Sequence, residues 1–124
     1  MQRIVLKSKI HRAVVTRADL NYEGSLSIDP ELMRLADIVV GEQVQVVNLA
    51  NGSRAVTYAI EGSPGEIGLN GAIAHLGGVG DRVIVMTYAH CDEAEARRLV
   101  PRVIQVDAGN RPRPGRTGAE VPAL

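Results

Sequence analysis

Residues 43–60 read QVQVVNLANGSRAVTYAI and contain the clearest β-hairpin pattern in the chain. Two runs rich in β-branched residues flank Asn51-Gly52, a pair that tolerates the positive φ of a type I′ turn. Side chains alternate between the two faces of a strand. One face of the second strand therefore carries Arg54, Val56, Tyr58 and Ile60, and the other carries Ala55, Thr57 and Ala59.

Outward from this hairpin, the rest of the chain predicts more short strands and two brief helices. Residues 2–16 alternate like one long or bent strand, and further strands are expected at 82–89 and 103–107. Asp29-Pro30 starts a helical pattern that runs to Val39, with Gly41 as its stop, and Asp92 with Glu95 forms a capping box for a second helix. This combination predicts one mainly β, barrel-like domain over residues 1–108, followed by a mobile C-terminal tail over residues 109–124.

Composition limits the classes of function. The 124 residues contain no Phe, no Trp and three Tyr, so the core has to be aliphatic, as in a small barrel or in subunits that cover one another. The chain has 14 basic and 14 acidic residues, which argues against nucleic acid or an anionic membrane as partner. One cysteine, no signal-peptide pattern and no apolar run of about 18 residues predict a cytoplasmic protein without a membrane span.

Three other motifs carry little weight. His90-Cys91-Asp92 has no second cluster at metal-ligand spacing, so no metal site is expected, and His11 and His75 are isolated and interpreted as structural. The glycine-rich run at 68–81 lacks the Gly-Lys-Ser/Thr ending of a phosphate loop.

Gly24-Ser25 has two interpretations. Gly-Ser is a common turn dipeptide, and taken alone it predicts only a turn. A serine hydroxyl can also attack the preceding carbonyl when the backbone is held in an unusual geometry, which glycine adopts easily. A donor such as the Thr57 hydroxyl would then stabilise the oxyanion on Gly24.

Three ordered motifs resemble those of the bacterial pyruvoyl-dependent aspartate 1-decarboxylases. They are YEGS at 22–25 after HRAVVTRADL, NGSRAVTYAI at 51–60 and LNGAIAHLGGVGD at 69–81. The likeness covers residues 1–107 in the same order and spacing. Asn21 and Ile73 depart from the usual pattern, which affects the fine shape of the pocket.

The resemblance implies a double-psi β-barrel that cuts itself between Gly24 and Ser25, giving fragments 1–24 and 25–124. Ser25 becomes a covalent pyruvoyl group, with no pyridoxal phosphate and no metal. That group forms a Schiff base with L-aspartate, which loses carbon dioxide to give β-alanine for pantothenate and coenzyme A. A homotetramer with active sites between subunits is also implied, and whether a helper protein promotes the cleavage stays open.

The resemblance also implies roles for particular residues. Tyr58 is the expected proton donor, and Gly24, Ser25 and Thr57 are the expected processing residues. The expected substrate-binding residues are Lys9, Arg54, Thr57, Asn70, Gly71, Ala72 and Ile73. Two alternatives remain at this point: a double-psi barrel that binds a partner and never cleaves, and a pyruvoyl decarboxylase of another small amino acid.

Overall fold

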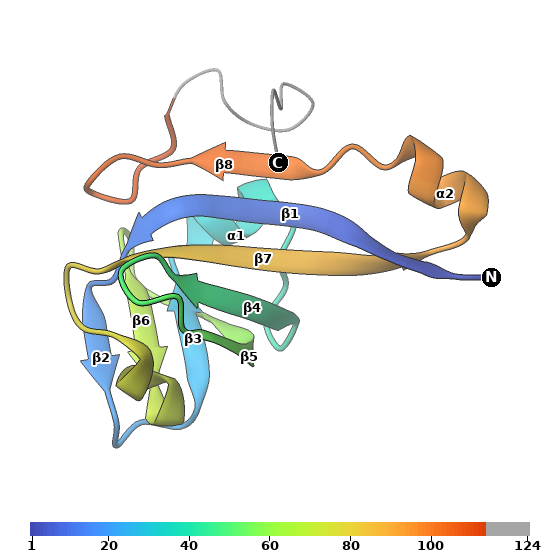
Figure 1. The fold of residues 1–124 in the computed structure, drawn as a ribbon. Helices are drawn as coiled ribbons and strands as arrows, with labels where there is room; N and C mark the ends of the chain where they lie inside the picture. The colour runs from blue at the N-terminus through green and yellow to red at the C-terminus, as the bar shows by residue number, and fades with distance from the viewer. Residues whose placement is uncertain (114–124) are drawn as a thin grey trace.

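Eight strands form one mixed sheet in the computed structural model, which describes residues 1–113 (Figure 1). The strands are β1 (Arg3–Val14), β2 (Arg17–Asp19), β3 (Ser25–Ile28), β4 (Gln43–Asn48), β5 (Arg54–Glu61), β6 (Ile67–Asn70), β7 (Arg82–Cys91) and β8 (Arg102–Gln105). Their order across the sheet is β2-β6-β3-β5-β4-β7-β1-β8. Three short helices accompany them: α1 (Pro30–Ala36), the 3-10 helix η1 (Gly71–Leu76) and α2 (Glu93–Arg98).

The connection between β1 and β2 makes the sheet curl. The two strands lie near opposite edges of the sheet, yet only Val15 and Thr16 separate them in the chain. Backbone hydrogen bonds from Val15 N to Asp81 O (2.9 Å) and from Thr16 N to Ile67 O (2.8 Å) hold this link in place. Parallel pairs (β1/β8, β2/β6, β3/β5) mix with antiparallel ones. The mainly β fold is confirmed, and its arrangement agrees with a double-psi barrel.

The core is aliphatic, as the composition predicts. Its side chains come from nearly every strand and from α1, so the barrel interior is filled by branched residues. The largest fully buried side chains are Ile10, Leu26, Ile28, Leu32, Ile67, Leu69, Ile104, Val15, Val44, Val46, Val83 and Val85.

The predicted hairpin is confirmed, but its predicted turn is wrong. Strands β4 and β5 pair antiparallel, and four residues, 49–52, connect the Asn48-Ser53 backbone pair. Gly52 has a φ of 74°, whereas Asn51 is not among the described residues with positive φ, so the turn is not type I′. The Asn51 side chain instead accepts from Ser53 N and donates to Leu76 O, which anchors the loop to the end of η1.

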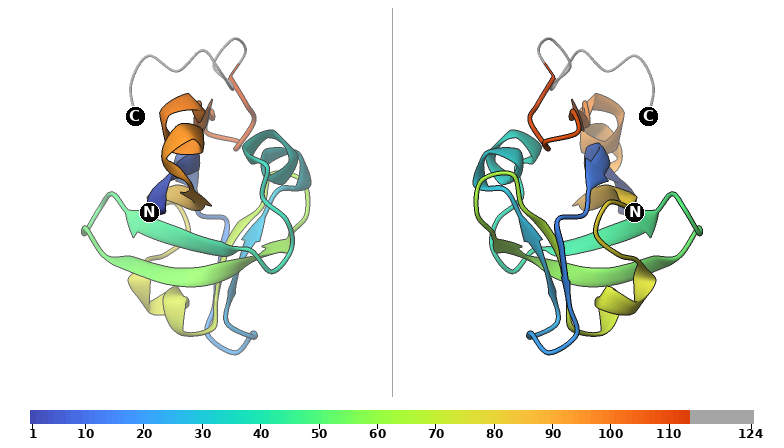
Figure 2. Two further views of the ribbon diagram at one scale, coloured as in Figure 1. Left: turned by 90° about the vertical axis from the view of Figure 1, so that its right-hand side faces the viewer. Right: turned by 90° about the vertical axis from the view of Figure 1, so that its left-hand side faces the viewer.

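Both predicted helices exist, and one is shorter than expected. Asp29 caps α1 through bonds from Glu31 N and Leu32 N, but the helix ends at Ala36 because Asp37 adopts the left-handed conformation (φ 55°). The expected extension to Val39 is therefore wrong. Asp92 and Glu95 form the predicted capping box of α2. Figure 2 shows α1 and α2 toward one end of the barrel and η1 toward the other, near the β2–β3 connection.

Residues 109–113 pack against the barrel, although the sequence places them in the tail. Asn110 is 1% exposed and spans two segments: its Oδ1 accepts from Val14 N, and its Nδ2 donates to Val14 O and Gly65 O. A buried polar clasp of this kind carries no apolar pattern, so the sequence does not reveal it. The rest of the expected tail, residues 114–124, lies outside the described residues. Within residues 1–113, the helices are too short or too polar to cross a membrane.

Candidate active site

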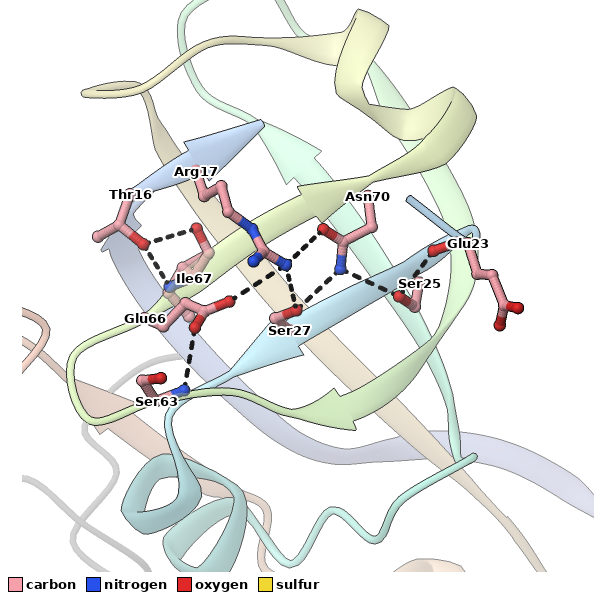
Figure 3. Close-up of polar contacts among 9 residues, drawn as sticks. All are labelled: Thr16, Arg17, Glu23, Ser25, Ser27, Ser63, Glu66, Ile67 and Asn70. Atoms are coloured by element: carbon pink, nitrogen blue, oxygen red, sulfur yellow. Dashed lines mark hydrogen bonds and ion pairs between the residues drawn. The ribbon is translucent and has the colours of Figure 1, made fainter. Parts of the chain in front are cut away.

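Ser25 is a buried serine at the start of β3. It is 1% exposed, and its Oγ accepts a hydrogen bond of 3.0 Å from Asn70 Nδ2 while donating to Glu23 O at 3.1 Å (Figure 3). The contact arises because β3 and β6 pair antiparallel, with Ser25 opposite Asn70. A buried hydroxyl with both partners in place has a defined orientation, which a serine in an exposed turn lacks.

Gly71 packs closely against the backbone of Gly24, the residue before Ser25. A Cβ atom at Gly71 would lie 2.8 Å from Gly24 Cα and 2.9 Å from Gly24 N, and the φ of Gly71 is 71°. At Gly24 itself a Cβ would meet no atom within 4 Å, and its φ lies outside the left-handed region. In the intact chain, the steric demand for glycine therefore falls on Gly71, and the part that Gly24 plays in the cleavage geometry stays a prediction.

Strand β5, which carries Thr57 and Tyr58, pairs with β3 from the residue after Ser25 onward. Leu26 pairs with Ala59 in the parallel β3/β5 ladder. Ser25 and Tyr58 each come one residue before this first pair of the ladder, and Gly24 and Thr57 come two residues before it. Thr57 is half-buried and Tyr58 is 40% exposed.

Arg54 shares the outward face of β5 with Tyr58, as the alternation predicts. It is exposed, and Val56 between the two is 60% exposed. A surface cavity of about 330 Å³ adjoins this face and is lined by Val56, Tyr88 and His90 among others. Neither Ser25 nor Asn70 lines this cavity, so it is separate from the candidate site.

Some of the remaining expected site residues lie near Ser25 and Gly71, and others lie far from them along the sheet. Ala72 is exposed at the start of η1 beside Gly71, whereas the Ile73 side chain belongs to the core. Lys9 lies on β1, and three strands (β5, β4 and β7) stand between β1 and β3 in the sheet order. Within one chain, the structure does not bring Lys9 next to Ser25 along the sheet.

His11 lies near Lys9 on β1. Burial lowers its pKa, and the neighbouring charges of Lys9 and Arg12 lower it further. Its Nδ1 is buried without a hydrogen-bond partner among the described residues. No group of three or more His, Cys, Asp or Glu side chains suited to a metal occurs in residues 1–113.

Sequence reasoning missed the polar groups behind Asn70. Asn70 Nδ2 also donates to Ser27 Oγ (2.8 Å), and its Oδ1 accepts from Arg17 Nη2 (3.0 Å). Arg17 further pairs with Glu66 Oε2 at 3.5 Å. The period-two alternation of β3 places Ser25 and Ser27 on one face, and that was the only available signal.

Comparison with known proteins gives one family. The profile of the family described as aspartate decarboxylase matches residues 1–113. The chain is 58% identical over 112 residues to an aspartate 1-decarboxylase of Mycolicibacterium smegmatis, covering 89% of this chain and 82% of that protein. It is 55% identical over 114 residues to an aspartate 1-decarboxylase of Thermoanaerobacter pseudethanolicus, covering 90% of this chain and 97% of that protein.

Proposed function

Because the chain belongs to the aspartate decarboxylase family, we propose that it removes the α-carboxylate of L-aspartate as carbon dioxide and releases β-alanine. The β-alanine would supply pantothenate and coenzyme A synthesis. The observation that carries the proposal is the buried contact between Ser25 Oγ and Asn70 Nδ2 beside Gly24. The one cysteine, Cys91, is free, which suits a reducing cytoplasm.

The first step is cleavage of the chain by its own serine. Ser25 Oγ attacks the Gly24 carbonyl carbon, the hydroxyl proton passes to the Ser25 nitrogen, and the C–N bond breaks to leave an ester. Water then takes the Ser25 α-proton while the Cβ–Oγ bond breaks, and its electron pair stays on Oγ as part of the Gly24 carboxylate. The new Cα=Cβ bond carries the amine, and addition of water with loss of ammonia gives the pyruvoyl group.

The residues around Ser25 fit such a group. Its carbonyls would accept the electron pair that the departing α-carboxylate leaves behind. Asn70 Nδ2, which contacts Ser25 Oγ in the intact chain, remains available to bind an oxygen at residue 25. Thr57, which precedes Tyr58 on β5, would donate its hydroxyl to the oxyanion of the cleavage step.

Two side chains on β5 complete the substrate site. The guanidinium of Arg54 binds a carboxylate of aspartate, because its planar fork matches two carboxylate oxygens. Tyr58, which follows Thr57 on β5, returns a proton to the α-carbon through its phenol. Asn70, Gly71 and Ala72 bind the substrate from the opposite side, where glycine permits close approach of backbone.

A homotetramer would bring Lys9 to this site. Three strands separate β1 from β3 in the sheet order, and in such an assembly Lys9 would reach the site from a neighbouring subunit. Several large apolar side chains are exposed, and contact with other copies would remove them from water. They include Ile4 (67%), Val39 (64%), Val40 (64%), Val56 (60%) and Val79 (70%).

Replacement of the nucleophile tests the proposal. The Ser25→Ala variant should neither cut itself nor form β-alanine from aspartate, while the matched Ser53→Ala variant, changed in the loop before β5, should do both. Equal β-alanine formation by the Ser25→Ala variant would contradict the proposal.

A further inference from the structure

We infer that Arg17 is a positioning residue for self-cleavage: its guanidinium fixes the Asn70 amide with the N–H groups toward Ser25. This inference rests on the proposed function. Among residues 1–113, Arg17 Nη2 donates to Asn70 Oδ1 at 3.0 Å and reaches Ser27 Oγ at 3.5 Å. No hydrogen bond in that range joins Arg17 to Ser25, which Arg17 reaches through Asn70.

The contacts form a short relay across three strands. Arg17 on β2 donates from Nη2 to Asn70 Oδ1 at 3.0 Å. Asn70 on β6 donates from Nδ2 to Ser25 Oγ at 3.0 Å and to Ser27 Oγ at 2.8 Å, both on β3 (Figure 3). Asn70 is 0% exposed, so water does not replace these partners.

Among the described side chains that bond the Asn70 amide, only Arg17 can set its direction. The two ends of an asparagine amide have nearly the same shape, and the hydroxyls of Ser25 and Ser27 can either donate or accept. A guanidinium has donors only, so it requires the oxygen of the amide to face it. Arg17 therefore directs Oδ1 toward itself, and Nδ2 is left facing the serines.

Arg17 is itself held from two sides. Its guanidinium lies 5.2 Å from the centroid of the Tyr22 ring, within the range of a cation–π contact. Its Nη2 lies 3.5 Å from Glu66 Oε2, and Glu66 accepts a bond from Ser63 N through Oε1. The Arg17 side chain is 43% exposed, so its replacement leaves the barrel core intact.

The direction of the amide matters because of what happens to Ser25 Oγ. In the elimination step this oxygen leaves with the electron pair of the Cβ–Oγ bond and becomes part of a carboxylate. An N–H already directed at Oγ stabilises the charge that develops there. A reversed amide would present its carbonyl oxygen to that charge and oppose it.

The test compares cleavage rates of the full chain, followed by denaturing gel and intact mass from freshly folded, uncut protein. Arg17→Met and Arg17→Gln both lose the guanidinium and end short of the position of Nη2, Met with an apolar end and Gln with a polar one. In Arg17→Lys a donor-only cation is kept. The Glu66→Gln variant loses the ion pair of Arg17 and keeps its bond to Asn70, which makes it the control for stability. Thermal unfolding of each uncut variant is measured alongside.

We expect the Met and Gln variants to cleave about tenfold more slowly or worse, the typical effect of losing one hydrogen bond to a charged group. The Lys variant should stay within about threefold of wild type and Glu66→Gln within about twofold. Wild-type rates in the Met or Gln variant would overturn the inference. So would a Lys variant as slow as Met, because the rate would then follow shape. A Glu66→Gln variant that is as slow as Met and is destabilised as much as Met would also overturn it, because the rate would then follow stability. An uncut wild-type protein would contradict the proposed function, and with it the step that Arg17 serves.

Discussion

The Gly71→Ala substitution probes the contact that shapes the cleavage site. Its new Cβ would lie 2.8 Å from Gly24 Cα and 2.9 Å from Gly24 N, and backbone atoms cannot rotate away as a side chain can. The left-handed φ of 71° costs alanine about 1–2 kcal/mol. The crowding adds about 1–3 kcal/mol, as overpacking does elsewhere. The total loss of unfolding free energy should therefore be about 2–5 kcal/mol, and Gly24 should move away from Ser25 Oγ.

Gly52→Ala is the matched control for that substitution. Gly52 has a φ of 74°, and a Cβ there would meet no atom within 4 Å, so only the cost of the conformation, about 1–2 kcal/mol, applies. Urea unfolding of uncut protein and the rate of chain cleavage are measured for both variants. Gly71→Ala should be the less stable and should cleave more slowly, whereas Gly52→Ala should cleave like wild type. Equal stability losses, with wild-type cleavage in both, would refute the argument.

Three further predictions concern turnover and pH. Tyr58→Phe should fold and cut itself but form β-alanine roughly 10²–10⁴-fold more slowly, because it lacks the donated proton; near-normal turnover would remove Tyr58 from its role. In fully processed Arg54→Ala, kcat/KM for aspartate should fall by a factor equivalent to about 2–3 kcal/mol of lost transition-state stabilisation. Arg34→Ala, on the exposed face of α1, should leave kcat/KM unchanged. Unchanged kinetics in Arg54→Ala would mean that Arg54 is only a surface charge. The pKa of Asp81 is held below 3.8 by hydrogen bonds from the Asn48 amide and Gly78 N–H, so its contribution to stability is present above that pH and is lost as pH falls through the folded-state pKa. The urea midpoint of unfolding should therefore drop less between about pH 5 and pH 3 in Asp81→Asn than in wild type. Equal drops in the two proteins would contradict this role of Asp81 in stability.

Local patterns predicted most elements of the fold. The alternation in residues 43–60 gave β4 and β5, and the Asp92-Glu95 capping box gave α2. The errors came where a single backbone conformation decides the outcome. Asp37 in the left-handed region ends α1 early, and the Asn51 side chain selects a longer loop over a type I′ turn. The spacing of apolar residues does not predict the backbone conformation of a single residue or the bond of a single side chain.

Only those residues of the candidate site that lie inside the family motifs could be predicted from the sequence. The resemblance assigned Ser25 and Asn70 to a common site, and the antiparallel β3/β6 register brings them together. Arg17 was not predicted, because its role depends on β2 pairing parallel with β6, a contact between segments about fifty residues apart. Asn110 was missed for the same reason, since its partners Val14 and Gly65 are distant in sequence.

The intact mass of the wild-type protein tests the central claim most directly. Self-cleavage predicts two fragments, residues 1–24 and 25–124, the larger of which begins with a carbonyl that reacts with a hydrazide and with borohydride. The Ser25→Ala protein, treated identically, should give one uncut mass and no reaction. A single mass of the uncut 124-residue wild-type chain, after prolonged warm incubation of correctly folded protein, would contradict the account.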